Sequence, residues 1–137
     1  VWVHGPVSLQ AEWDHAFLDR KAGRGDLDFW GVYVQASWFP TGEQRRYHRA
    51  SGVFGPVIPL EDFAPWKGRW GAVQLGARFS HLDLDDKDIR GGIESNVGLA
   101  LNWFLFPQLR LSANWIYGHV NGQGDVHILQ GRFQIEY

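Results

Sequence analysis

The last eleven residues of the chain, HILQGRFQIEY at positions 127–137, carry the clearest fold signal in the sequence. Mostly apolar side chains at every second position alternate there with polar ones: His127, Leu129, Gly131, Phe133, Ile135 and Tyr137 stand against Gln130, Arg132, Gln134 and Glu136. Successive side chains of a β-strand point to opposite faces of its sheet, so a period of two residues is typical of a strand. The stretch therefore predicts a strand with one apolar and one polar face.

The same alternation occurs five more times upstream. In one of these stretches, for example, Trp30, Val32 and Val34 share one face while Tyr33 and Gln35 share the other. The five predicted strands cover residues 6–19, 28–39, 70–84, 96–106 and 109–119. At about 10 to 14 residues each, they exceed the five or six residues usual in soluble sheets and suit a tilted membrane crossing. The sequence predicts an all-β protein, an antiparallel transmembrane β-barrel to which this chain contributes about six long strands.

The connections between the predicted strands differ in length. Residues 41–69 are irregular because glycine and proline interrupt them repeatedly, and we expect them to form a connection on the periplasmic side. Residues 85–95 and 120–125 are polar and predict longer loops, whereas residues 106–108 predict a minimal turn. Outer-membrane barrels have short periplasmic turns and longer outer loops, which gives this orientation. An additional strand pair within 45–60 is the main alternative, and it would reverse the first two strands.

The composition excludes several classes of protein. No run of about 18 apolar residues occurs, so the sequence predicts no transmembrane helix. The formal net charge of −2, without a stretch that combines Lys, Arg and stacking aromatics, argues against nucleic-acid binding. Cysteine is absent, which excludes disulfides and thiolate metal sites, and the six histidines show no metal-ligand spacing. We expect no metal, no cofactor and no catalytic activity.

The apolar and polar faces of the predicted strands suggest two different surroundings. The polar faces carry Gln, Asn, Ser, Arg and Glu, which need water or a polar network. The apolar faces carry aromatic residues towards the strand ends, as in the girdles at the two membrane–water interfaces: Trp13, Trp30, Trp38, Trp103, Trp115 and Tyr137. One alternative is a soluble β-sandwich that binds carbohydrate through its aromatics, with the apolar faces packed inward. Another is a barrel with a structural or adhesive role that does not conduct.

Several blocks of the sequence, in their order, carry a family resemblance. They are YVQASWF at 33–39, TGE at 41–43, SGVFG at 51–55, LGARFSHLDL at 75–84, IRGG at 89–92 and GLALNWF at 98–104, followed by Pro107 and LRL at 109–111. In this arrangement the chain resembles the phosphate-selective porins O and P of the bacterial outer membrane. The blocks cover most of the chain from Pro6 onward.

The resemblance implies a 16-stranded barrel in the outer-membrane lipid that assembles as a homotrimer, with a pore through each subunit. Residues 1–137 would then form the C-terminal part of one barrel domain, about its last third. Six strands are too few to close a known barrel, so we expect further strands before Val1, or several copies building one barrel. The resemblance also implies that the barrel-assembly machinery recognises the last strand, with Phe133, Ile135 and the terminal Tyr137.

The function implied by the resemblance is a porin that lets small anions such as phosphate diffuse passively through a water-filled channel. Guanidinium groups suit phosphate and carboxylate because they can form two parallel hydrogen bonds to either. The candidate pore-lining residues are therefore the arginines of the polar faces and their polar neighbours: Arg78, Arg110, Arg132, Gln74, Asn114 and Gln130. Alternatively, these arginines pair with Glu12, Asp14 or Glu136 and only make the wall rigid.

Overall fold

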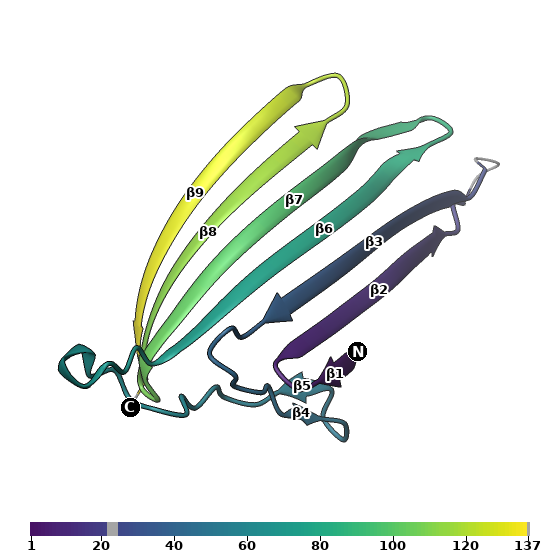
Figure 1. Cartoon of the computed structure of the whole chain (residues 1–137). Coiled ribbons are helices and arrows are strands. Elements are labelled where there is room, and N and C mark those ends of the chain that lie inside the picture. The colour runs from purple at the N-terminus through teal and green to yellow at the C-terminus, as the bar shows by residue number, and fades with distance from the viewer. Residues whose placement is uncertain (22–24, 137) are drawn as a thin grey trace.

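A computed structural model of the chain describes residues 1–21 and 25–136. Its main feature is one curved antiparallel sheet in the order β1-β2-β3-β6-β7-β8-β9 (Figure 1). The strands are β1 (Trp2–His4), β2 (Val7–Leu18), β3 (Leu27–Trp38), β6 (Ala72–Asp86), β7 (Ile89–Phe106), β8 (Leu109–Val120) and β9 (Gly124–Ile135). The prediction of an all-β, antiparallel fold with six long strands is confirmed, and the short β1 adds a seventh. Among the described residues, β1 and β9 do not pair with each other, so the sheet is open.

The register of the sheet separates apolar from polar positions. Leu9, Ala36, Ala77, Leu99, Trp115 and Leu129 are successive cross-strand partners from β2 to β9. On the opposite face, the neighbouring row is Ser8, Ser37, Gly76, Ala100, Asn114 and Gln130. The apolar row is exposed, with half of the surface of Leu99 accessible. In the part of the chain that the structure describes, no second sheet covers this apolar face, which is not the arrangement of a β-sandwich.

The height of the apolar face fits a membrane. On β3 it runs from Trp30 to Trp38, eight residue steps that span about 27 Å along an antiparallel strand. At the tilt of about 40° typical of membrane barrels, this becomes roughly 20 Å along the membrane normal, close to the apolar band of about 25 Å of such barrels. A tryptophan stands at each end of the run. The girdle role of the aromatic residues stays a prediction, and Tyr137 lies outside the described residues.

The turn between β6 and β7 corrects one prediction. The prediction of a polar loop at 85–95 is wrong, because β6 continues to Asp86 and β7 begins at Ile89, so most of these residues lie in strands. A bulge between Asp83 and Asp85 bends the hairpin, and Asp85 Oδ1 accepts a hydrogen bond of 2.7 Å from the Gly92 amide. Beyond the apolar run both faces of a hairpin meet water, so polar residues there are compatible with a strand. Loop length therefore no longer decides which end of the sheet faces outward.

The segment between β3 and β6 crosses beneath the end of the sheet where the Pro107–Gln108 turn lies. It contains a separate hairpin of β4 (Tyr47–His48) and β5 (Val53–Phe54), and the short 3-10 helix η1 (Pro65–Lys67). The alternative strand pair in 45–60 is thus present, but it stays outside the main sheet and β3 pairs directly with β6. The first two long strands are therefore not reversed. The placement of this segment in the periplasm stays a prediction.

A small core fixes this segment to the sheet. Phe39, Ala72 and Phe104 are buried together, and Val57 of the segment packs against them. Phe104 and Ala72 are cross-strand partners, and both lie on the polar face near the end of the sheet. The segment therefore covers part of the polar face rather than hanging free. Within the described residues, the structure contains no helix with the length and apolar composition needed to cross a membrane.

Candidate functional site

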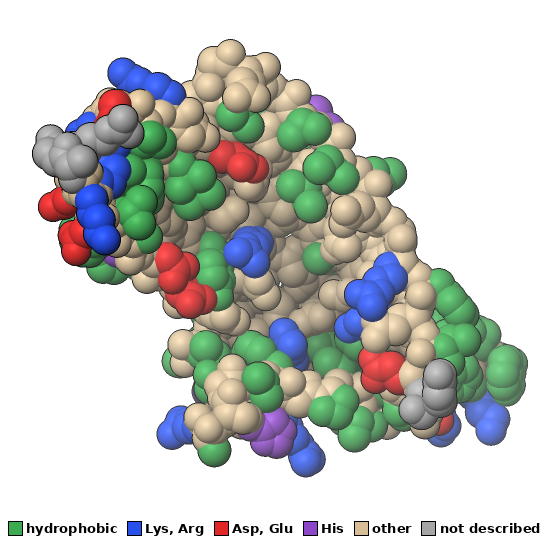
Figure 2. Space-filling view, turned by 180° about the vertical axis from the view of Figure 1, so that it is seen from behind, with side chains coloured by type: hydrophobic (Ala, Val, Ile, Leu, Met, Phe, Trp, Pro, Cys, Tyr) green, Lys and Arg blue, Asp and Glu red, His purple; other side chains and the backbone are tan. Residues whose placement is uncertain are grey.

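The polar face of the sheet is hollowed, and both basic and acidic side chains lie around the hollow (Figure 2). Five of the six predicted pore-lining residues line this one hollow: Gln74, Arg78, Arg110, Asn114 and Gln130. Arg132 lies on the same face, opposite Ser112 of β8, but outside the lining. These five residues come from β6, β8 and β9, and the rest of the lining comes from β3, β7 and the segment before β6, so the sheet register alone brings most of the lining together. Their role in permeation stays a prediction.

Hydrogen bonds between strands make the wall of the hollow rigid. Gln74 is buried, and its Oε1 accepts a hydrogen bond of 3.1 Å from Nδ2 of Asn102. The Ser112 hydroxyl lies 2.7 Å from Oδ1 of the same asparagine and donates to it. Ser8 and Ser37 share a hydrogen bond of 2.7 Å across β2 and β3. Amide and hydroxyl groups thus satisfy one another across the strands.

The predicted arginines contact aromatic rings and amides. The guanidinium carbon of Arg78 lies 4.2 Å from the ring centroid of Tyr33, whose hydroxyl donates a 2.8 Å hydrogen bond to Glu12. Arg110 donates a hydrogen bond from Nη2 to Oε1 of Gln134. Across the described residues, neither these two arginines nor Arg132 forms an ion pair with a carboxylate. Among these residues, therefore, the structure contains no ion pair of the kind that the rigid-wall alternative requires with Glu12, Asp14 or Glu136.

A fourth arginine, which sequence reasoning missed, reaches the polar face from the segment below. Arg45 precedes β4, and its guanidinium carbon lies 3.9 Å from the Phe54 ring centroid. It shares a pocket with Arg110 and Gln134. The Nε atoms of both arginines are buried without a hydrogen-bond partner. Burial, and secondarily the positive charge of Arg110, lower the pKa of Arg45. The two cations therefore lie close together with donor capacity to spare.

A buried carboxylate closes the segment that carries Arg45. Glu43 is 3% exposed, and its Oε1 accepts a 3.2 Å hydrogen bond from the Leu60 amide. Its other oxygen accepts a hydrogen bond from the hydroxyl of Thr41, and that hydroxyl accepts one of 3.0 Å from the Val73 amide of β6. These hydrogen bonds connect two separate parts of the segment to each other and connect the segment to β6 of the sheet. The only sequence signal for the site is the Arg45-Arg46 doublet, and it does not indicate towards which face of the sheet either side chain points.

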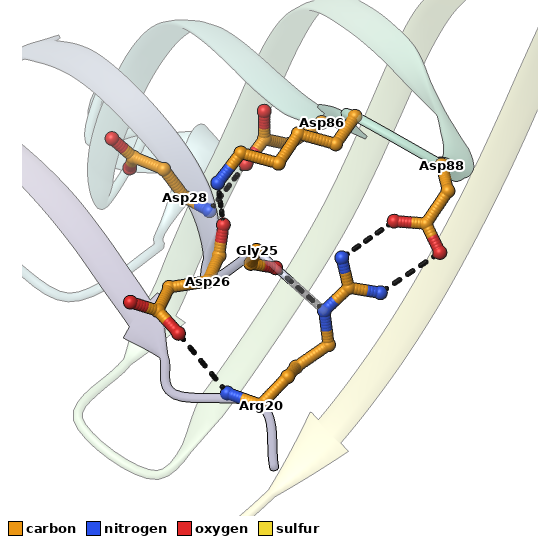
Figure 3. Close-up of polar contacts among 7 residues, drawn as sticks. Arg20, Gly25, Asp26, Asp28, Asp86 and Asp88 are labelled. Atoms are coloured by element: carbon orange, nitrogen blue, oxygen red, sulfur yellow. Dashed lines mark hydrogen bonds and ion pairs between the residues drawn. The ribbon is translucent and has the colours of Figure 1, made fainter. Parts of the chain in front are cut away.

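The opposite end of the sheet is held by contacts between two turns (Figure 3). Arg20, after β2, forms a bidentate ion pair with Asp88 in the β6–β7 turn, with 2.9 Å between Nη1 and Oδ2. The hydrogen bond to Asp88 raises the pKa of Arg20. Asp86 accepts a 2.9 Å hydrogen bond from the Asp28 amide, and Lys87 donates to the Asp26 carbonyl. These contacts align the hairpins and provide no group for chemistry at the hollow.

A sheet of long strands with an exposed apolar face and a hollowed polar face that carries unpaired arginines is typical of porins. The comparison with protein families agrees: the model of the family "Phosphate-selective porin O and P" matches residues 1–137, the whole chain. The chain belongs to this porin family, as its sequence blocks predict.

A relative supports the assignment without adding a known activity. An uncharacterized protein of Caulobacter vibrioides is 33% identical over 103 residues, which are 75% of this chain and 20% of that protein. The chain thus spans about a fifth of the length of the curated relative that it matches.

Proposed function

We propose that this chain forms part of the wall of an outer-membrane porin through which small anions such as phosphate diffuse passively. The observation that carries the proposal is the pair Arg45 and Arg110, whose buried Nε atoms have no partner at the edge of the hollow. An anion between them offsets the repulsion of the two cations and accepts their free hydrogen bonds. Family membership supports the porin role, and the arginines support the preference for anions.

The positions of the arginines suggest a path rather than a single site. In the sheet register, Arg78 stands at the level of Ile116 on β8, and Arg132 at the level of Ser112. Arg110 lies six residues from Ile116, about 20 Å along the strand. An anion moving along the polar face meets one cation after another. Such a series of moderate sites permits both entry and exit, which conduction requires.

The same surfaces support the proposed membrane setting. The exposed apolar face suits outer-membrane lipid, and the polar face suits a water-filled lumen. We propose that the chain contributes to a closed barrel of 16 strands, three copies of which form the assembly, and that closure gives each edge strand, β1 and β9, a further neighbouring strand, because a bilayer does not tolerate an open sheet edge. The alternation of Phe133 and Ile135 on β9 supports recognition by the barrel-assembly machinery. We propose no catalytic activity for this protein.

The test uses the complete protein in planar lipid bilayers under a KCl gradient. Wild-type protein is expected to conduct and to give a reversal potential that shows anion preference. Arg45→Ala and Arg110→Ala are each expected to reduce this preference, and the double variant to lose less than the sum, because the two residues share one site. Arg49→Ala is the matched control, since that exposed arginine lies in the β4–β5 turn away from the hollow.

Two results would count against the proposal. A folded barrel without conductance would favour the structural or adhesive alternative. The other contrary result is a conducting pore with the same reversal potential in wild type, both single variants and the double variant. That result would show that Arg45 and Arg110 do not determine the anion preference. Arg110→Lys separates charge from shape, because lysine keeps the charge but loses the planar fork of donors.

A further inference from the structure

The segment between β3 and β6 carries an exposed aromatic turn at residues 62–70. Trp66, at the tip of the turn in η1, is 78% exposed and is the most exposed of the eight tryptophans. Trp70, at its end, is 60% exposed. Figure 1 shows this turn as the teal coil at the lower left, on the other side of the sheet end from β4 and β5. Arg45 of the same segment lines the hollow of the polar face, whereas the base of this turn contacts Trp103 of the apolar face.

The turn is held rigidly rather than being a loose loop. The Phe63 amide donates a 2.8 Å hydrogen bond to the Leu105 carbonyl, and Trp103 Nε1 donates one of 2.6 Å to the Trp70 carbonyl. A β-bridge between Ala64 and Arg69 closes the turn. The structure therefore holds Trp66 exposed in a defined position. This exposure is unfavourable in water, because burial of an indole ring removes a large apolar surface from the solvent.

The base of the turn is continuous with the apolar face of the sheet. The Phe63 ring lies edge-on to Trp103, with 5.3 Å between the ring centroids, and 6.2 Å from Trp70. Trp103 is the cross-strand partner of Val73 and Leu111 at this end of the apolar face. The aromatic cluster therefore begins where the apolar run of β7 ends.

Charged residues alternate with the aromatics in the turn. Lys67 follows Trp66 directly, and Arg69 precedes Trp70 and pairs with Glu61 at 3.7 Å. The cores of protein–protein interfaces are depleted in Lys and Glu, so this mixture does not suit a buried contact with a partner protein. Indole rings combined with basic side chains suit the headgroup level of a bilayer, where rings meet acyl chains and cations meet lipid phosphates.

We propose that residues 62–70 are a membrane-interface anchor, with Trp66 and Trp70 at the headgroup level of the leaflet nearest the Pro107–Gln108 turn and Lys67 beside lipid phosphates. The inference rests on the proposed function only in requiring that the barrel spans a membrane. The anchor fixes the depth of this end of the sheet in the bilayer. It lies away from the hollow, so the ion current does not depend on it.

The test is spin labelling of the complete protein reconstituted in lipid vesicles. This chain contains no cysteine, so each cysteine introduced here is the only thiol in the chain, and any cysteine elsewhere in the complete protein is replaced first. Trp66→Cys and Lys67→Cys carry the label on the anchor, and the second variant retains Trp66. Ser51→Cys is the matched control, exposed in the β4–β5 turn of the same segment. Labels at 66 and 67 are expected to collide more often with oxygen than with a water-soluble nickel chelate, and the label at 51 to show the reverse.

Two outcomes would overturn the anchor. Labels at 66 and 67 that read as aqueous, like the one at 51, would show a turn that lies in water. Labels that neither reagent reaches would show a turn packed against protein, including a second copy of the chain. Conductance of the Trp66→Cys protein is measured in parallel and is expected to equal that of wild type. A conducting protein with aqueous labels refutes only the anchor, whereas a membrane-inserted protein that does not conduct refutes only the porin role.

Discussion

Replacing Glu43 tests how the segment that carries Arg45 is held against the sheet. The Glu43 carboxylate accepts hydrogen bonds from the Leu60 amide and the Thr41 hydroxyl, and at 3% exposure water cannot replace it without opening the segment. Hydrogen bonds to a charged group contribute about 1.5–3 kcal/mol each, so Glu43→Ala is expected to make local opening easier by roughly 3–6 kcal/mol. Glu43→Gln retains an acceptor oxygen, and we expect it to cost much less.

Hydrogen exchange of the reconstituted protein measures this difference. Even the lower estimate of about 3 kcal/mol corresponds to roughly a 100-fold faster exchange of the Leu60 amide in Glu43→Ala. Amides of β8, which do not contact Glu43, should keep their wild-type rates. In bilayers the same variant should lose part of its anion preference, because Arg45 is no longer held at the hollow. The reasoning is refuted if the Leu60 amide exchanges at its wild-type rate, or if β8 amides accelerate equally.

Three further predictions concern other parts of the molecule. Gly71→Ala should destabilise the protein by at least about 2 kcal/mol in urea unfolding, because a left-handed residue with a side chain costs about 1–2 kcal/mol and the new Cβ would lie 2.3 Å from the Phe104 carbonyl oxygen. Gly131→Ala, with no atom within 4 Å of the added carbon, should be tolerated. Arg20→Ala should broaden the distribution of distances between spin labels in the β2–β3 and β6–β7 turns, because it removes the ion pair with Asp88 and the hydrogen bond to the Gly25 carbonyl. Conductance should stay unchanged, since neither contact lies at the hollow. Anion preference, measured as the reversal potential, should stay constant between about pH 5 and pH 8. Burial lowers the pKa of Arg45, but an arginine starts from so high a pKa that its guanidinium stays protonated over this range. A loss of charge should appear only in strongly alkaline solution.

The sequence predicted the membrane-crossing part of the fold well because two different surroundings act on each strand. Where one face is apolar and the other is polar, a shift of one residue would exchange every side chain between them, so the alternation determines both the strand and its register. The predicted strands at 28–39 and 109–119 accordingly lie within one residue of β3 and β8 at each end. The pore-lining candidates Arg78, Asn114 and Gln130 share one face for the same reason.

The remaining structure depends on contacts that no local pattern records. Past the apolar run, the β6–β7 hairpin has two wet faces, so the residues at 85–95 show no alternation and look like a loop although they form strands. The path of the segment that carries Arg45 depends on the hydrogen bond between Glu43 and the Leu60 amide and on the packing of Val57 against the buried cluster at the sheet end, contacts between residues far apart in sequence. Proline and glycine in this segment indicated only that no long strand passes through it.

The central claim is that one face of this sheet meets lipid and the other meets water, and thiol labelling of neighbouring positions tests it most directly. Cysteine replaces Arg78 and Asn114 on the polar face, and Ala77 and Ala113 beside them on the apolar face, one at a time in the complete protein in outer membranes. The account predicts rapid reaction of a charged, membrane-impermeant thiol reagent at 78 and 114, and protection at 77 and 113. Equal labelling at adjacent positions, or labelling only at 77 and 113, would contradict it.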